Sequence, residues 1–465
     1  MMTLDQAADL FSHLKAYSSA DEVEAVFYGG HSALTRFANN TIHQNVSEEH
    51  YGVSVRSSFE GRTARATTNK LDLDSLKQVV HASERLAKVQ EPDPDLLPMP
   101  DTRETQRHSA TTMAGIPLRH FEHTAATTPD ERAQAIANMV SVGQRHQLTA
   151  AGIFAISDTI EGIFNSRGVA DWHKQTSSDI SITMLAANSS GWQKANSPDV
   201  ANLEPLLLAE TAARKAIDSA NPREVSPGKY TVILEPAAVL DIIGFMFYDF
   251  GGLAILDQRS FLNNRIGQRI FGENINISDD VAHPLQSGAP FDGEGVRRHR
   301  IPLVEKGIVK RLVYARASAA KMSRSQYKQD VGLIEATGHG FPLPNEMGEA
   351  PLNVVFGTPA ESKTVDQMIS ATEQGVLVTR LWYIREVDPY EKILTGMTRD
   401  GTFYIQNGRL GHGLLNFRFN ESLLHLLSNV EEMGQPVRAS GEESFDMVVP
   451  AMKVKDFNFT EVTKF

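Results

Sequence analysis

The first 220 residues repeat one pattern of apolar and polar positions twice. Alternation with a period of two predicts strands with one buried face, and apolar residues spaced three and four apart predict helices. In the first copy, strands are predicted over 32–38, 41–47, 51–57 and 61–67, followed by a helix over 76–89. In the second copy, strands are predicted over 152–157, 162–165, 169–174, 178–187 and 191–196, followed by a helix over 203–217. Each copy is therefore predicted to be an antiparallel sheet closed by a helix.

The two copies, about 1–90 and 129–220, are predicted to form one N-terminal domain over 1–225. The linker between them, 91–110, starts with a proline-rich, acidic stretch that favours an extended connection. A further helix over 129–142 is predicted to introduce the second copy. Thr127 or Thr128 can cap its first turn.

A break at 221–228, rich in proline and polar residues, separates this part from the C-terminal half. The pattern there predicts a strand over 230–234, a helix starting at Pro236, a helix over 260–270, a turn at 278–280 and a hairpin of 301–305 with 308–314. We therefore expect a sheet-rich C-terminal domain over 226–465. The fold class predicted for the whole chain is α+β.

Residues 376–408 predict three further strands in series. Val376–Val387 is rich in β-branched and aromatic residues, and Pro389 ends that run. Asp400-Gly401 and Asn407-Gly408 are dipeptides that accept the positive backbone angles of tight hairpin turns. The pattern alone predicts a meander.

Composition excludes several classes of protein. The 45 Lys and Arg against 57 Asp and Glu give a net charge of −12, which argues against a general nucleic-acid surface. No apolar run approaches the roughly 20 residues that span a bilayer, and the N-terminus lacks the pattern of a secretory signal. The absence of cysteine excludes disulfides and thiolate metal sites. We expect a cytoplasmic protein that binds neither nucleic acid nor membrane.

Three strings carry a resemblance to a known family: Arg380–Arg385 (RLWYIR), Leu394–Gly401 (LTGMTRDG) and Asn416–Ser422 (NFRFNES). Together they resemble the C-terminal signature of the TldD/PmbA family, also called modulator of DNA gyrase. The resemblance implies a subunit of a metal-dependent peptidase, with a peptidase-type cleft in the C-terminal domain.

The zinc motif of that family is degenerate in this chain. The catalytic branch carries His-Glu-x-x-x-His on a helix, and matching on Gly244 places Leu240 and Phe245 at the histidines and Asp241 at the glutamate. The third family ligand is a cysteine, and the best local match is Ser440. A catalytic zinc site uses three protein ligands of nitrogen, sulfur or carboxylate type. We therefore expect neither a metal nor a catalytic residue here, and interpret Asp241 as a solvated or capping carboxylate in the first turn of a helix.

The resemblance thus implies a subunit of the PmbA or TldE type, with no cofactor of its own. Its expected partner is a zinc-bearing TldD-like homologue in a heterodimer, or a second copy in a homodimer, and its expected substrates are unfolded or small peptides.

Peptide contacts are predicted at two places. Trp382, Tyr383 and Arg385 lie on one predicted strand, and a Gly-x-Gly loop carries His339; its glycines are Gly338 and Gly340. Because neighbouring strand residues face opposite sides, one of Trp382 and Tyr383 is expected to face the cleft and the other to pack inward.

Two alternatives remain open from the sequence. An autonomous hydrolase could use another metal set, for instance Asp241 with Glu294 and His339. A peptide-binding or maturation protein would need no peptidase partner. Against the first, Asp292-Gly-Glu-Gly295 is more typical of a tight turn than of a cation loop. No Gly-x-Ser-x-Gly pattern supports a serine hydrolase either.

Overall fold

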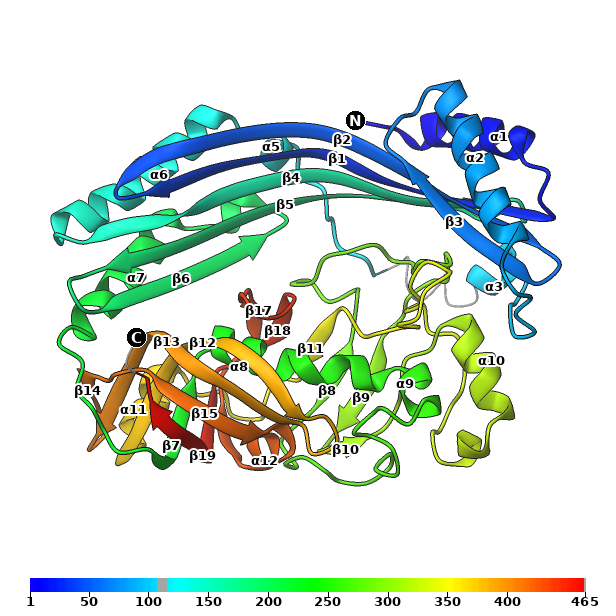
Figure 1. The fold of residues 1–465 in the computed structure, drawn as a ribbon. Helices are drawn as coiled ribbons and strands as arrows, with labels where there is room; N and C mark the ends of the chain where they lie inside the picture. The colour runs from blue at the N-terminus through cyan, green and yellow to red at the C-terminus, as the bar shows by residue number, and fades with distance from the viewer. Residues whose placement is uncertain (107–114, 464–465) are drawn as a thin grey trace.

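A long antiparallel sheet arches over the C-terminal half of the chain (Figure 1). The computed structural model describes residues 1–106 and 115–463, and in these ranges the arch has six strands in the order β3-β2-β1-β4-β5-β6. They are β1 (Glu22–Ala38), β2 (Thr41–Phe59), β3 (Arg62–Thr68), β4 (Thr149–Asn165), β5 (Ala170–Leu185) and β6 (Ser190–Ser197).

Helices cover one face of the arch at both ends. They are α1 (Leu4–Tyr17) and α2 (Leu73–Lys88) at one end, and α6 (Pro129–Arg145) and α7 (Pro205–Asp218) at the other; short segments are α3 (Thr102–Thr105), α5 (Glu122–Ala125) and η1 (Val200–Asn202). Phe27 of β1 belongs to the apolar cluster beneath α1 and α2, and Phe37 of β1 to the cluster beneath α6 and α7. Both residues are odd-numbered on one strand, so the two helix pairs lie on the same face. The order helix, three strands, helix thus occurs twice.

The opposite face of the arch meets the C-terminal half. Val26 of β1 and Ile163 of β4 pack there against Ala289 and Phe291. This face is therefore the inner one, and it can line a space between the two halves.

The strands of the arch are longer than the sequence pattern predicts. The predicted strands 41–47 and 51–57 are one strand, β2, and the second copy likewise merges into β4 and β5. β1 also continues through Gly29 and Gly30, with φ of 123° and 142°. A Cβ on Gly30 would lie 2.1 Å from the carbonyl oxygen of Asp158, so only glycine permits β4 to approach this closely.

Two sheets build the C-terminal half. In the described ranges, the first has the order β12-β7-β19-β15-β13-β14 with β16 paired to β19, and the second has the order β10-β9-β8-β11-β18-β17. The strands of the first are β7 (Gly228–Leu234), β12 (Gln374–Asp388), β13 (Ile393–Gln406), β14 (Arg409–Gly413), β15 (Phe417–Ser422), β16 (Val430–Met433) and β19 (Met452–Val462). Those of the second are β8 (Ile277–Asp279), β9 (Ile301–Glu305), β10 (Ile308–Val309), β11 (Val354–Phe356), β17 (Val437–Ala439) and β18 (Met447–Val449).

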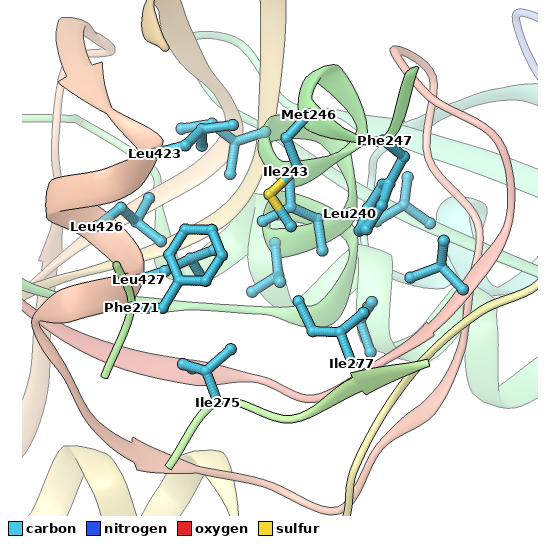
Figure 2. Packing of buried hydrophobic residues seen from close by; sticks show 14 of the residues in the cluster. Leu240, Ile243, Met246, Phe247, Phe271, Ile275, Ile277, Leu423, Leu426 and Leu427 are labelled. Atoms are coloured by element: carbon cyan, nitrogen blue, oxygen red, sulfur yellow. The ribbon is translucent and has the colours of Figure 1, made fainter. Parts of the chain in front are cut away.

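The main core lies between these sheets and includes α8 (Figure 2). The helical segments are α8 (Pro236–Ile243), η2 (Gly244–Phe250), α9 (Gly252–Leu256), α10 (Arg316–Arg324), η3 (Gln326–Gln329), α11 (Val365–Ser370) and α12 (Leu423–Ser428). None of the helices in the described ranges combines the length and the apolar character that crossing a membrane requires. The mixture of helices and sheets confirms the predicted α+β class.

Three local predictions in this half are wrong. Residues 260–270 form successive turns, because the Ser260 and Asn263 side chains bond to nearby backbone N–H groups in place of a helix. Ser278 lies inside β8 and not in a turn. Asp400-Gly401 lies inside β13, where its positive φ angles fit an irregularity opposite β12; Asn407-Gly408 does form the predicted turn, between β13 and β14.

Candidate functional site

A cavity of about 370 Å³ lies between the inner face of the arch and the C-terminal half. Glu161 of β4 lines it from the arch. From the other side it is lined by parts of the segments 286–298 and 338–342, and by Phe445 and Asp446. The predicted Gly-x-Gly loop therefore does lie at a cavity.

His339 is buried at the base of that loop. Its Nδ1 lies 2.9 Å from Thr337 Oγ1, and its Nε2 lies 2.9 Å from Asp279 Oδ1. Desolvation lowers the pKa of His339. Burial alone would raise the pKa of Asp279, but His339, Arg298 and the backbone N–H of Asn353 outweigh it and hold that pKa well below its usual range. His339 is thus a fixed loop residue beside a carboxylate.

The Asp292–Gly295 turn holds the same loop in place. Asp292 Oδ1 accepts the backbone N–H of Glu294 and Val296, and its Oδ2 accepts the N–H of Gly340 at 2.8 Å. Burial and then the charge of Glu294 raise the pKa of Asp292 above its usual range. The geometry is that of a tight turn, as the flanking glycines predict.

The positions matched to the family's zinc ligands lie on and beside α8. Pro236 is the first residue of this helix, as predicted. Leu240 is completely buried and projects into the apolar core near Phe247 and Ile277 (Figure 2). Phe245 packs against the same core, and Ser440 is buried with only a hydroxyl to offer. The residues present therefore do not fit a catalytic zinc ion.

Asp241 is not the solvated first-turn carboxylate that the sequence suggested. It is completely buried in the second turn of α8, and its Oδ1 accepts the backbone N–H of Glu442 at 3.1 Å and of Glu443 at 3.2 Å. Desolvation raises the pKa of Asp241 to about 7 in spite of these bonds. The prediction failed because the partners lie about 200 positions away in the sequence.

The segment 440–446 links α8, the cavity and the arch. A Cβ on Gly441 would lie 2.2 Å from Asp241 Oδ1, so the segment packs directly on the helix. Lys194 of β6 donates from Nζ to the Gly441 carbonyl at 3.0 Å. Glu443 Oε1 accepts the backbone N–H of Tyr383 at 2.7 Å, and Asp446 lines the cavity.

Neither Trp382 nor Tyr383 fills the core, contrary to the expectation from strand alternation. The register of β12 shifts between Trp382 and Arg385, and Tyr383 has a φ of 55°. Tyr383 is 54% exposed, with the Arg385 guanidinium 4.5 Å from its ring centre. Trp382 is half-buried, and Arg380 and Arg399 lie over its ring at 5.3 and 4.8 Å.

The two groups of predicted peptide contacts are not brought into one cavity. Gly338, His339 and Gly340 line the cavity described above, whereas Trp382, Tyr383 and Arg385 do not. The connection between the groups is the segment 440–446, through Glu443 at one end and Asp446 at the other.

The alternative metal set is also not assembled. Asp241 bonds to the segment 440–446, Glu294 lies 3.4 Å from Arg316 Nη1, and His339 lies beside Asp279. Within residues 1–106 and 115–463, no three His, Asp or Glu side chains are grouped so that they could hold a metal ion.

Sequence reasoning missed Glu161. Strands were predicted to stop at 157 and to restart at 162, because the residues between them include the charged Asp158 and Glu161. In the structure β4 runs through this stretch and turns Glu161 to the inner face of the arch. A charge inside an otherwise strand-like run was the available signal.

Comparison with known families gives a direct match. The model described as PmbA/TldA metallopeptidase C-terminal domain matches residues 227–461, just over half of the chain. The chain belongs to the PmbA/TldD family. A second model, PmbA/TldA metallopeptidase domain 1, matches residues 23–87 in the arch. The family resemblance inferred from the C-terminal strings is thereby confirmed.

Relatives in the PmbA/TldD family extend over nearly the whole chain. Metalloprotease PmbA of Escherichia coli O157:H7 is 21% identical over 458 residues, which cover 94% of this chain and 92% of that protein. The crystal structure of TldE from Thermococcus kodakarensis aligns with a TM-score of 0.85 at 17% identity, covering 98% of this chain and all of that one. A putative modulator of a DNA gyrase from Thermotoga maritima aligns with a TM-score of 0.83 at 17% identity, over 98% of this chain and all of that one. These two structures show that the fold is shared.

Proposed function

We propose that this chain is a PmbA/TldE-type subunit of a metallopeptidase complex that acts on unfolded or small peptides, and that it carries no catalytic zinc. The observation that carries this proposal is the chemistry of Leu240, Phe245 and Ser440. Two of these side chains have no lone pair, and the third is a neutral hydroxyl. Leu240 also belongs to the core, so its apolar character serves the fold.

The proposed partner is a TldD-like homologue that carries the zinc, with a second copy of this chain as the alternative. Hydrolysis needs a polarised water and a base, and the partner would supply both. The assignment of this chain as the TldE-type member of such a pair is supported by the fold that it shares with a protein named TldE. The absence of cysteine is consistent with a cytoplasmic complex.

Peptide binding is proposed to use main-chain hydrogen bonds along exposed strands, which give affinity with little sequence preference. Among residues 1–106 and 115–463, part of β2 offers such an edge, because β3 pairs only with residues 53–59 of it. Tyr383 and Arg385 are exposed on β12 and offer side-chain contacts. A peptide-binding or maturation protein with no peptidase partner would use the same features, and it remains the second candidate.

The test is metal content and peptidase activity of the purified full-length chain. We expect well under one zinc per chain after dialysis, and no cleavage of an unstructured peptide by the chain alone. Addition of the zinc-bearing homologue should give cleavage that a chelator abolishes. The Ser440→Ala variant is the control and should behave as the unmodified chain does.

One tightly held zinc per chain, or chelator-sensitive cleavage by the chain alone, would overturn the proposal in favour of an autonomous peptidase. The second candidate, a peptide-binding or maturation protein, would be favoured by a different result. In that case the chain binds peptide, but no zinc-bearing homologue co-purifies with it or activates it.

A further inference from the structure

The cavity between the arch and the C-terminal half has mainly apolar walls with a few charged groups. Phe291, Phe341 and Phe445 contribute rings to it, and Leu352 contributes an aliphatic side chain. Its volume of about 370 Å³ is that of a small-ligand site. A side chain or the end of a peptide fits such a space, whereas a folded domain does not.

Most charged residues around the cavity have their own partners. Asp292 accepts three backbone N–H groups, Asp446 lies 3.2 Å from Arg438 Nη2, and Arg298 lies 3.3 Å from Asp279. His339 is held between Thr337 and Asp279. These groups shape the wall of the cavity and are not free for a ligand.

Glu161 differs from them. Among residues 1–106 and 115–463 nothing forms a hydrogen bond or an ion pair with its carboxylate, and Arg298 acts on it only through space. Glu161 is an exposed residue that lines the cavity, and the protein around its carboxyl raises the pKa of that group by desolvation. An unpaired carboxylate beside apolar walls attracts a cation that brings its own hydrogen-bond donors.

We propose that this cavity binds an alkylammonium group of a peptide, with Glu161 as the anion that receives it. The apolar walls suit the methylene groups that precede the charge, and the carboxylate suits the ammonium at the end. Either the amino terminus of a peptide or a lysine side chain provides this chemistry. The peptide part of this inference rests on the proposed function, but the amine site does not.

The first experiment uses a small probe and the full-length chain. n-Pentylamine is compared with 1-pentanol, which has the same alkyl chain without the charge, by following the melting temperature. At about ten times its dissociation constant, the amine should raise the melting temperature of the unmodified chain by about 1–2 °C. Pentanol should not.

The Glu161→Gln variant keeps the shape of the side chain and removes its charge, so it should fold and lose the response to the amine. The Glu305→Gln variant is the matched control, because Glu305 is an exposed strand glutamate outside the cavity; it should retain the response. Equal effects of amine and alcohol, or an unchanged response in Glu161→Gln, would overturn the proposal.

The second experiment identifies the source of the amine with four peptides of one length. They differ only in a free or acetylated amino terminus and in lysine or norleucine at one position. Loss of the relevant ammonium should weaken binding to the unmodified chain about tenfold and leave binding to Glu161→Gln unchanged. If acetylation weakens binding in this way, the bound group is the amino terminus. If norleucine does so, the bound group is the lysine side chain.

Failure of this inference is distinguishable from failure of the proposed function. Equal affinity for all four peptides would refute amine recognition in peptides while peptide binding stands. A response to pentylamine without binding of any peptide would support the site and refute the proposed peptide binding.

Discussion

Asp241 is a single residue with two opposed energetic effects. It bonds the segment 440–446 to α8, yet its Oδ2 is buried without a hydrogen-bond partner among the described residues. Its folded pKa of about 7 lies above the ordinary value of 3.8. The folded chain therefore keeps a proton that the unfolded chain releases, and the stability that this proton contributes is lost as the pH rises from about 4 to about 7.

We predict that Asp241→Asn removes this pH dependence. Relative to the variant, the unmodified chain should lose up to about 4 kcal/mol of unfolding free energy between pH 4 and pH 7. Urea unfolding at several pH values measures the difference, and Asp330→Asn, at an exposed position, serves as the control. Parallel pH curves for the unmodified chain and Asp241→Asn would contradict the assignment.

A second prediction concerns the aromatic pair on β12. Tyr383→Ala should cost less than about 1 kcal/mol, because the ring is exposed, and half-buried Trp382→Ala about 1–2 kcal/mol. Phe403→Ala, in a fully buried position, is the reference and should cost about 3–5 kcal/mol. Thermal unfolding gives the order. Peptide affinity should also fall in the Tyr383→Ala variant. If this variant changes stability but binds peptide as the unmodified chain does, the proposed peptide-binding role of Tyr383 is refuted.

At the scale of elements, the close approach of β1 to its neighbours depends on two glycines. We predict that Gly30→Ala lowers the free energy of unfolding by more than about 3 kcal/mol. The new Cβ would lie 2.1 Å from a backbone oxygen of β4, and a paired strand cannot move aside as a flexible side chain can. Gly267→Ala has a positive φ of 79° but nothing within 4 Å, so only backbone strain of about 1 kcal/mol is expected there. Denaturant unfolding of both variants checks the comparison, and equal costs would contradict it.

Elements with a complete local signal could be predicted from the sequence. The helix that starts at Pro129 has its Thr128 cap, whose side chain accepts the N–H of Glu131. The hairpin of β9 and β10 turns at Lys306-Gly307, although β10 ends at Val309 and not at 314 as predicted. β1 was predicted ten residues too short, because buried Glu24 and the pair Gly29-Gly30 interrupt the pattern. Glu24 is tolerated there since Arg56 and Arg65 pair with it, and no local rule contains that information.

Some features of the candidate site could likewise be predicted from the sequence, and others could not. The apolar residues at the positions matched to the two histidines of the family motif could be read from the sequence, because those positions lie close together around Leu240. The contacts of Asp241 and the cavity beside Glu161 could not, since both depend on segments that meet only in three dimensions. Residue type alone does not reveal whether a carboxylate has a partner.

At the scale of the whole molecule, the arch and the C-terminal half are joined by buried polar contacts. Arg119 lies just before α5, and its carbonyl oxygen accepts the backbone N–H of Thr176 in β5 at 2.9 Å. Its side chain donates from Nη2 to the carbonyl oxygens of Val281 at 2.9 Å and His283 at 3.1 Å, and from Nη1 to that of Gln286. Desolvation lowers the pKa of Arg119 to about 10. Removal of this side chain takes the donor from the carbonyl groups of Val281 and Gln286, whereas that of His283 still accepts the backbone N–H of Gln286.

We predict that Arg119→Ala lowers stability by about 3–5 kcal/mol and separates unfolding of the arch from that of the C-terminal half. Calorimetry should then show two transitions, and limited proteolysis should cut near the connection at 221–228. Arg300→Ala is the control, because Arg300 is exposed and its ion pair with Asp280 is long, at 3.8 Å. Calorimetry of this variant should show a single unfolding transition. A single transition in Arg119→Ala would show that other contacts suffice.

The place of Leu240 in the main core has an evolutionary consequence. A histidine there would bring an imidazole into apolar surroundings before a second ligand existed to share a metal ion with it. A single change of Leu240 to histidine would therefore lower stability without completing a set of zinc ligands. Under the proposed function, selection would remove such an intermediate, and the chain would stay dependent on a zinc-bearing partner.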